Sequence, residues 1–204
     1  MHPNPAFRRA DAETALAHVR DRAFGTLAVN AEGGPLLAHV PVLLAPDGAS
    51  VDLHLVRSNP ILRALPAPAV IAVAGPDAYV SPDWYGVPDQ VPTWNYVAVH
   101  LRGPLAALDH GAMRDLLDRQ SAEMEARLAP KRPWTTGKMT PDALDRMMRQ
   151  IVPCRMAVAS VDATVKAGQN KPDDVRLRAA TALEGAALGA GAAAMAALMR
   201  DPPA

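Results

Sequence analysis

The segment "PTWNYVAVHLRGPLA", residues 92–106, decides the fold. Polar and apolar residues alternate through residues 94–100, a period of two that is typical of a β-strand with one buried face. Two aromatic rings, a histidine and an arginine lie on one face of this strand: Trp94, Tyr96, His100 and Arg102. The chain has only eight aromatic residues, so the contacts made by this face bear directly on function.

Short strand-like runs of the same kind recur along the chain. Besides residues 93–108, they cover residues 24–30, 35–45, 51–57, 69–75, 77–81 and 154–167. Turn signals separate several of them, at Glu32–Pro35, Pro46–Gly48 and Gly75–Asp77. Short strands joined by tight turns favour an antiparallel barrel or sandwich over βαβ units. The sequence therefore predicts a mainly β fold with flanking helices.

Helical spacing predicts the flanking elements. The expected helices cover residues 11–22, 113–128, 141–150 and 172–183, the third capped by Thr140. We expect one domain over residues 1–183, with a helical insertion at about residues 109–150. Residues 184–204 are expected to form an Ala/Gly-rich helix and a short tail. The uncharged run Gly185–Met199 has 15 residues, fewer than the roughly 20 needed to span a bilayer, so it predicts a packed or interface helix.

The composition restricts the class of protein. Lys and Arg together number 21, as do Asp and Glu, so the net charge of zero exerts no general attraction toward nucleic acid or membrane. Cys154 is the single cysteine, which excludes a disulfide framework and a thiolate metal cluster. The N-terminal residues contain no apolar stretch of the signal-peptide type. We therefore expect a cytoplasmic protein.

The segment "LHLVRSNPILRAL", residues 53–65, is a candidate phosphate site. Val51, Leu53 and Leu55 are expected to face the core, whereas Asp52, His54 and Val56 are expected to face outward. Asn59 and Pro60 are suited to begin a helix, whose free N–H groups favour anions. Arg57 and Ser58 precede that start and would complete a phosphate site. The alternative is an ordinary capped helix beside a solvated arginine.

Five of the eight aromatic residues occur within 18 residues: Tyr79, Trp84, Tyr85, Trp94 and Tyr96. The proline-rich link "SPDWYGVPDQVP" between them predicts a rigid loop rather than a helix. An aromatic wall with a few polar anchors suits a flat heterocycle. The alternative is a cluster that belongs to the core.

Other polar residues allow more than one interpretation. His39 and His100 each lie among apolar neighbours and could be core histidines, and no spacing typical of a metal site occurs. The segment "KAGQNK", Lys166–Lys171, closes the last strand and could be a polar loop. No GxGxxG or P-loop motif is present, so a nucleotide cofactor would be held without a Rossmann or Walker motif.

Together these segments resemble the PaiB family of FMN-binding negative transcriptional regulators. The segments that carry the resemblance are "FGTLAVN", "AHVPVLL", "HLVRSNP", "GPDAYVSPDWY", "VPTWNYVAVHLRG" and "KAGQNK", in this order. The resemblance extends from about residue 1 to 183, and "VPTWNYVAVHLRG" is its most specific part. The Ala/Gly-rich tail after Leu183 lies outside it.

The resemblance implies a homodimeric split β-barrel that binds FMN outside the barrel, at the subunit interface. Arg57, Ser58 and Asn59 are expected to hold the phosphate. Trp94 and Asn95 are expected to lie near the isoalloxazine ring. The full set of expected flavin contacts is His39, His54, Arg57, Ser58, Asn59, Trp94, Asn95, Lys166 and Gln169.

The resemblance favours flavin-dependent sensing or regulation. The alternative is a flavin-dependent oxidoreductase of a small substrate, because flavin reductases and pyridoxamine phosphate oxidases also use split barrels. The flavin would then carry the chemistry, and His39, His54 or His100 would donate a proton. No catalytic residue is assigned. A small-molecule substrate or a partner protein is expected in either case.

Specific DNA binding by this chain alone is not expected. Residues 114–155, the candidate region, hold nine Lys or Arg against six Asp or Glu. Specific binding usually needs several phosphate contacts as well as side chains at base edges. An excess of three positive charges, spread over helices and a loop, is a weak basis for such binding.

Overall fold

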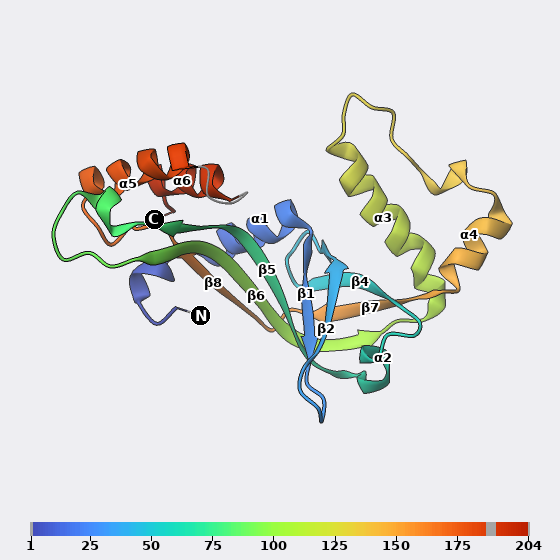
Figure 1. Cartoon of the computed structure of the whole chain (residues 1–204). Helices are drawn as coiled ribbons and strands as arrows, with labels where there is room; N and C mark the ends of the chain where they lie inside the picture. The colour runs from blue at the N-terminus through green and yellow to red at the C-terminus, as the bar shows by residue number, and fades with distance from the viewer. Residues whose placement is uncertain (1, 187–190, 204) are drawn as a thin grey trace. The chain divides into compact units, whose positions relative to one another are not determined.

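The computed structural model describes residues 2–186 and 191–203, and its chain divides into two compact units. The first unit consists of the segments Met1–His18, Val73–His100 and Val161–Ala204. The second unit consists of the segments Val19–Ala72 and Leu101–Ser160. Two long strands, β5 (Ala67–Val80) and β6 (Thr93–Ala107), contribute residues to both units (Figure 1).

The second unit contains the curled part of the sheet. Its strands, besides parts of β5 and β6, are β1 (Phe24–Val29), β2 (Leu36–Pro41), β3 (Leu43–Leu44), β4 (Ser50–Val56) and β7 (Ile151–Ala157). Their order is β2-β1-β5-β6-β7-β4-β3. The pairings of β1 with β2 and β5, of β4 with β3 and β7, and of β6 with β7 are antiparallel. Strands β2 and β4 are also in contact. The sheet therefore curls back on itself, as the predicted barrel requires.

Alternation of side chains builds the core of the second unit. In β1 every second residue is buried, and in β4 Val51, Leu53 and Leu55 are buried as predicted. The same core contains further buried apolar residues: Leu27, Val29, Val40, Ile71, Leu101, Leu105 and Met156. Because a strand presents successive side chains to opposite faces, the other face of these strands stays outside the core.

Helices flank this sheet. The second unit holds α2 (Ile61–Ala64), α3 (Met113–Ala126) and α4 (Pro141–Met148), and α1 (Ala12–Arg22) contributes residues to both units. Met113 and Leu116 of α3 pack on Leu43 of β3 in a separate apolar cluster. The predicted helices after residue 109 are therefore present, and α3 is held by apolar packing as well as by charge.

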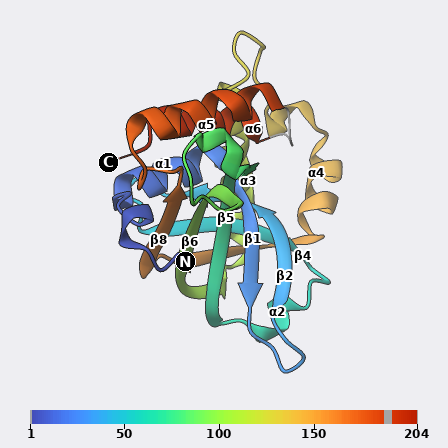
Figure 2. The same cartoon turned by 60° about the vertical axis from the view of Figure 1, so that its left-hand side comes forward.

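The first unit packs two C-terminal helices on a small part of the sheet. Strand β8 (Ser160–Lys166) pairs with β6, and α5 (Asp173–Ala186) and α6 (Ala192–Arg200) lie side by side (Figure 2). Met195 and Met199 of α6 are fully buried in a core that includes Val97 and Leu183. The described part of the predicted Ala-rich helix is therefore packed in a core. Residues 187–190 of that prediction lie outside the described residues.

Some predicted boundaries were wrong. The predicted runs 69–75 and 77–81 form one strand, β5, which ends at Val80 and has no turn at Gly75–Asp77. A Cβ at Gly75 would lie 2.7 Å from the Cβ of Val97 and 2.8 Å from Cε1 of His18. Glycine at this position therefore serves a close approach of neighbouring segments, which is a common reason for glycine inside a strand.

Other runs were divided or shortened by tertiary contacts. The run 35–45 forms two strands, separated at Val42, whose N–H bonds to the carbonyl of Ala23. The run 154–167 likewise divides into β7 and β8. The helix predicted after Asn59 has only four residues and starts at Ile61. Residues Pro82–Tyr85 in the predicted rigid loop form a single 3-10 turn.

Asp52 was predicted to face outward, but its side chain is only 5% exposed. Arginine side chains from α3 and β7 bond to it and shield it from water. None of the helices within residues 2–186 and 191–203 combines the length and the apolar character needed to cross a membrane.

Candidate functional site

Strand β6 presents the face identified in the sequence, and the predicted alternation is confirmed. Asn95, Val97, Val99 and Leu101 are buried, whereas Trp94 is 56% exposed and Arg102 is exposed. The ring of Trp94 meets that of Tyr79 edge to face, with 6.4 Å between centroids. A large aromatic surface in the first unit is therefore held in a fixed orientation yet open to a ligand.

Asn95 has a different environment from its neighbour Trp94. The two residues project from opposite faces of β6, and Asn95 is only 1% exposed. Its Nδ2 atom is buried and has no hydrogen-bond partner among the described residues. Asn95 is thus an unsatisfied polar group beside the core of the first unit, whereas Trp94 is the exposed aromatic group.

The segment Lys166–Lys171 forms a closed turn in the first unit. Gly168 adopts φ 76°, a left-handed conformation that favours glycine. The amide of Gln169 accepts a bond from the N–H of Ala167 at 2.8 Å and donates to the carbonyl of Val165 at 2.5 Å. Gln169 therefore stabilises the turn with its own side chain. Lys166, at the start of the turn, bonds to the hydroxyl of Thr93, the residue before Trp94.

Arg57 lies in the second unit, where backbone carbonyls position its guanidinium. Its Nε donates to the carbonyl of Arg149 at 2.7 Å, and Nη2 donates to that of Ile151 at 3.4 Å. The side chain remains exposed. Two carbonyl contacts leave further N–H groups of the guanidinium available for an anion.

Ser58 and Asn59 continue this segment. Ser58 is exposed in the turn after β4, and the Asn59 side chain accepts from the N–H of Ile61 at 3.0 Å. The three residues expected to hold a phosphate thus lie consecutively at the end of β4. The expected helix N-terminus is weak, because α2 has only one turn.

The two expected histidines also lie in the second unit. His39 is exposed on β2, and its Nδ1 lies 3.1 Å from Oγ1 of Thr26 on β1. His54 is half-buried on β4, and its Nδ1 has no hydrogen-bond partner in the described part of the chain. Burial lowers the pKa of His54, so this imidazole is mostly neutral at pH 7.

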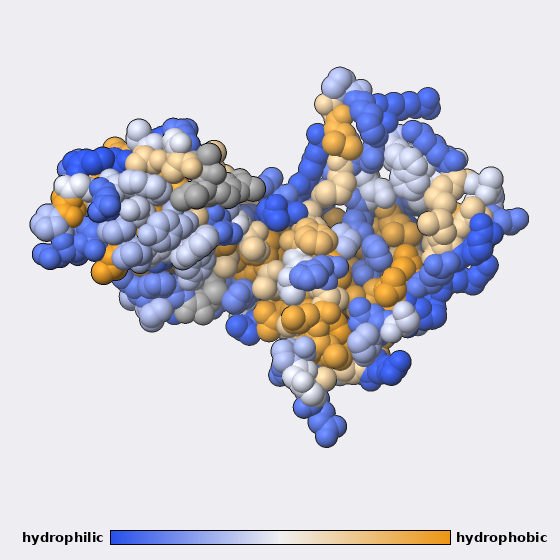
Figure 3. Space-filling model, viewed as in Figure 1, coloured by the Kyte–Doolittle hydropathy of each residue, from blue (hydrophilic) through white to orange (hydrophobic). Residues whose placement is uncertain are grey.

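A hollow lies on the outer face of the sheet in the second unit. Its volume is about 540 Å³. Its lining consists of Ala28, Asn30, the segment Pro66–Val70, Arg102, Gly103 and Pro104. Side chains in this hollow are small, and Arg102 brings a guanidinium to its edge. The outer face of β1 and β2 also exposes Phe24 and Leu37, and Figure 3 shows apolar surface where Figure 1 draws these strands.

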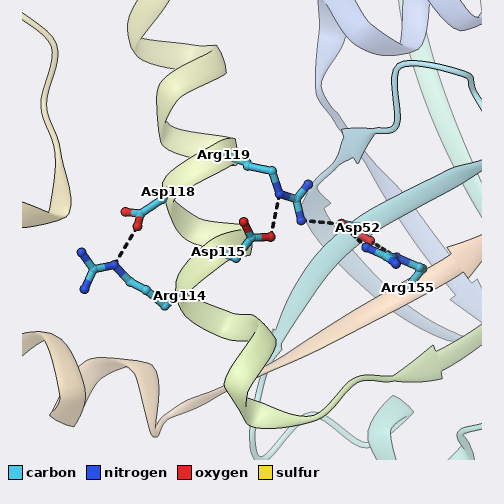
Figure 4. Close-up of polar contacts among 6 residues, drawn as sticks. All are labelled: Asp52, Arg114, Asp115, Asp118, Arg119 and Arg155. Carbon is cyan, nitrogen blue, oxygen red and sulfur yellow. Dashed lines mark hydrogen bonds and ion pairs between the residues drawn. The ribbon is translucent and has the colours of Figure 1, made fainter.

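A buried carboxylate and two arginines form a cluster in the second unit that the sequence did not reveal (Figure 4). Arg155 of β7 bonds Asp52 through Nε at 2.6 Å and Nη2 at 2.9 Å. Arg119 of α3 bonds the same carboxylate through Nη2 at 2.9 Å and Asp115 through Nε at 2.8 Å. We call Asp52, Arg119 and Arg155 the Asp52 cluster.

Electrostatics in the Asp52 cluster favour the ionised carboxylate. Burial by itself would raise the pKa of Asp52, but hydrogen bonds from Arg155 and Arg119, together with their charges, lower it below its ordinary value. Both oxygens of the carboxylate accept bonds from these arginines, Oδ1 from Arg155 and Oδ2 from Arg155 and Arg119. The cluster therefore attaches α3 to the sheet, and it leaves no free carboxylate for proton transfer.

The site residues expected from the sequence are distributed over both units. The first unit holds Trp94, Asn95, Lys166 and Gln169, and the second holds His39, His54 and the segment 57–59. The sequence identified Arg102 by its exposed strand position but gave no sign of the hollow beside it. Lys171 and Gln90 were also missed as partners, because they are 81 residues apart.

The curled antiparallel sheet with flanking helices defines the class: a split-barrel protein of the kind that binds flavins. The family model described as "Putative FMN-binding domain" matches residues 1–160, so the chain belongs to this family. "Protease synthase and sporulation protein PAI 2" of Bacillus subtilis (strain 168) is 28% identical over 169 residues, 81% of this chain and 80% of that protein. The predicted family and its cofactor, FMN, are confirmed.

Two solved structures support the fold. The FAD and heme binding protein from Mycobacterium smegmatis has a TM-score of 0.57 at 19% identity, covering 79% of this chain and 74% of that chain. The flavocytochrome Anf3 from Azotobacter vinelandii has a TM-score of 0.60 at 15% identity, covering 82% of this chain and 73% of that chain. At these identities the similarity establishes the split-barrel fold alone.

The residues described above are chemically suited to FMN. An FMN molecule presents a flat, largely apolar ring system and a dianionic phosphate. The second unit offers a shallow hollow with small side chains, and cations at Arg57 and Arg102. The first unit offers the exposed face of Trp94. Stacking surfaces and cations are the two kinds of group that such a ligand requires.

Proposed function

We propose that this chain binds FMN as a homodimer and acts as a flavin-dependent sensor or regulator. The observation that carries the proposal is the hollow on the outer face of the second unit, next to the apolar surface of β1 and β2. In this proposal Arg57, Ser58 and Asn59 contact the phosphate, and Trp94 contacts the isoalloxazine ring. The flavin, once bound, supplies redox chemistry that no side chain of this protein has.

The remaining expected residues have narrower roles in this proposal. His39 and His54 border the flavin, and Asn95 offers an unsatisfied amide. Gln169 stabilises the turn that positions Lys166, rather than contacting the flavin through its own amide. Each role is testable by substitution. Asn95 is only 1% exposed beside the core of the first unit, so its variants also need a measurement of stability.

The homodimer is supported by exposed apolar surface. Phe24 is 47% and Leu37 61% exposed on neighbouring strands, and such surface usually marks an interface. Light scattering at micromolar concentration should report a dimer. Replacing Leu37 with glutamate should shift the equilibrium from dimer to monomer. The same replacement at the exposed Leu128 is the control and should leave the dimer intact. A wild-type monomer at that concentration would exclude this part of the proposal.

FMN binding is tested by titration of the flavin-free protein. Flavin fluorescence should be quenched with about one site per subunit. Replacing Arg57 with alanine should weaken binding by about 1.5–3 kcal/mol if a charge-assisted bond to the phosphate is lost. Arg63 is exposed in α2 and forms no ion pair within residues 2–186 and 191–203, so it is the matched control. No quenching at any flavin concentration would end the proposal.

A flavin-dependent oxidoreductase is the second candidate. The observation that favours it is the exposed imidazole of His39, which a hydroxyl of Thr26 orients on the outer face of the sheet. An imidazole oriented in this way can donate or accept a proton in the reaction of a bound substrate. NAD(P)H oxidation stimulated by the protein and FMN, and reduced when His39 is replaced with glutamine, would favour the enzyme over the regulator.

Specific DNA binding by the chain alone is not part of the proposal. Most cations of residues 114–155 bond to carboxylates: Arg114 to Asp118, Arg119 to Asp115 and Asp52, Arg127 to Glu123, Lys131 to Glu125, and Arg155 to Asp52. Regulation would then act through a partner protein or a flavin-reactive metabolite. Anisotropy titration against the upstream DNA at about 150 mM salt tests this. Sub-micromolar binding that survives nonspecific competitor would restore a direct repressor.

A further inference from the structure

The turn Lys166–Lys171 brings two of the four lysines of the chain to one place in the first unit. The left-handed Gly168 reverses the backbone, and the N–H of Lys171 bonds to the carbonyl of Gly168 at 3.0 Å. The Gln169 side chain holds the turn from within. Because the turn is fixed by its own hydrogen bonds, the positions of the two lysines are determined by the fold.

Neutral groups position both ammonium groups. Lys166 donates to the hydroxyl of Thr93, and Lys171 donates to the side-chain carbonyl of Gln90. The ammonium of Lys171 also lies over the ring of Tyr85, 4.3 Å from its centroid. The amide nitrogen of Gln90 is in turn engaged with the carbonyl of Pro88 at 3.0 Å. Both cations are thus oriented, but neither is neutralised by these contacts.

Carboxylates are absent from this arrangement. Across residues 2–186 and 191–203, neither lysine forms an ion pair. The acids that follow the turn, Asp173 and Asp174, pair with Arg176 and Arg178 instead. Both lysines are half-buried. Burial lowers the pKa of Lys166, and the charge of Lys171 lowers it further, so the two cations repel each other.

We propose that Lys166 and Lys171 form an oxyanion-binding site that accepts a phosphate or carboxylate group. An ammonium has three N–H donors, and each of these two uses one of them on a neutral oxygen. An anion between them would accept the remaining donors and remove the repulsion. The Thr93 hydroxyl accepts from Lys166 and retains its own proton to donate to the same anion.

Two sources could supply such an anion: the phosphate of FMN or a separate small metabolite. Both present the same chemistry to two ammonium groups. The site goes beyond the proposed function, which assigns the flavin phosphate to Arg57, Ser58 and Asn59. An oxyanion at the lysine pair can therefore bind whether or not that assignment is correct.

The small number of lysines permits a direct measurement. Biosynthetic incorporation of ¹³C-lysine labels Lys131, Lys138, Lys166 and Lys171 and leaves the three N–H donors of each ammonium in place. Inorganic phosphate is then titrated into the flavin-free protein. The signals of Lys166 and Lys171 should shift together along one saturable curve. Signals of Lys131 and Lys138, which lie in the other unit, should change only with ionic strength.

Variants test the assignment. In K171Q, phosphate affinity at the Lys166 signal should fall at least tenfold, and K171R should restore much of it. K138Q, which removes one exposed charge, should leave the affinity unchanged. Circular dichroism should show all three variants folded. If the Lys166 and Lys171 signals move no more than those of Lys131 and Lys138, or if K138Q weakens binding equally, the proposal is wrong.

A competition experiment distinguishes the two sources. FMN and riboflavin differ by the phosphate alone. If FMN but not riboflavin displaces inorganic phosphate from the lysine pair, the flavin phosphate is the anion. If neither displaces it, the site binds a separate oxyanion. If K171Q retains FMN binding but loses phosphate binding, the lysine site is distinct from the FMN site of the proposed function.

Discussion

Two charged clusters, one in each unit, show opposite arrangements. In the Asp52 cluster a carboxylate that is 5% exposed accepts bonds from two arginines, and the exposed Asp115 takes a further bond from one of them. At the turn in the first unit, Lys166 and Lys171 contact a hydroxyl, an amide and an aromatic ring. Together with Asp115, the first cluster has two carboxylates for two arginines, whereas the second has only positive groups.

The difference separates a structural role from a binding role. A buried carboxylate that lost its arginines would be strongly destabilising, so the Asp52 cluster must stay closed in the folded protein. Two half-buried ammonium groups without an acid destabilise the folded state by their mutual repulsion. A bound anion would offset this destabilisation. Local imbalance of charge in an ordered site is therefore the better sign of ligand binding.

Replacing Asp52 with alanine should give the largest effect. The substitution removes the acceptor of three charge-assisted bonds and leaves two guanidinium groups near each other. Water partly compensates because both arginine side chains are nearly half exposed. We expect a loss of about 2–3 kcal/mol in the free energy of unfolding, measured with urea. D115A, which removes a 70% exposed partner, should cost no more than about 0.5 kcal/mol. Equal losses in both variants would contradict a special role for Asp52.

The same cluster predicts a pH dependence. The pKa of Asp52 is lower in the folded than in the unfolded chain, so its contribution is complete above the unfolded value, about 3.9, and is lost as pH falls through the folded value. The stability difference between wild type and D52A should therefore shrink as pH falls below about 4. A difference that stays constant down to pH 2 would show that the carboxylate charge contributes nothing.

Phosphate should stabilise the protein through the lysine pair. A ligand that binds only the folded state at ten times its dissociation constant raises the free energy of unfolding by about 1.4 kcal/mol. Thermal unfolding in phosphate, with chloride of equal ionic strength as reference, should show this gain in wild type and K138Q but not in K171Q. The same gain in K171Q would place the phosphate elsewhere.

Replacing Arg155 with lysine tests geometry at constant charge. Arg155 meets both oxygens of Asp52 through a planar fork, which a lysine ammonium cannot reproduce. We expect a loss of about 1 kcal/mol, smaller than that of D52A. Urea unfolding of R149K provides the control, because the Arg149 side chain forms no ion pair in the described part of the chain. No loss in R155K would mean that charge alone holds the cluster.

The smallest expected effect has the opposite sign. Without added anions, K171Q should be more stable than wild type by about 0.5 kcal/mol, because one of two repelling cations is removed. Unfolding in a phosphate-free buffer at low ionic strength measures the difference. If K171Q is instead destabilised, the bonds of Lys171 to Gln90 and Tyr85 outweigh the repulsion and are structural.

The residues of the expected FMN site could be predicted only in part from the sequence. The alternation in residues 94–100 correctly separated exposed Trp94 from buried Val97, because the face of a strand residue follows from its position alone. Arg57, Ser58 and Asn59 were located by their place after a strand. Nothing local showed that the Arg57 guanidinium bonds to carbonyls 92 and 94 residues away.

By itself, the sequence determined the strand alternation, the core residues of β4 and the order of motifs that identifies the flavin-binding family. The tertiary structure decided the burial of Asp52, the continuity of β5 through Gly75 and the pairing of Lys171 with Gln90. The physical reason is range. Side-chain direction repeats every two residues, whereas Asp52 meets arginines 67 and 103 residues away. Such contacts exist only once β4 has paired with β7 and α3 has packed on the sheet.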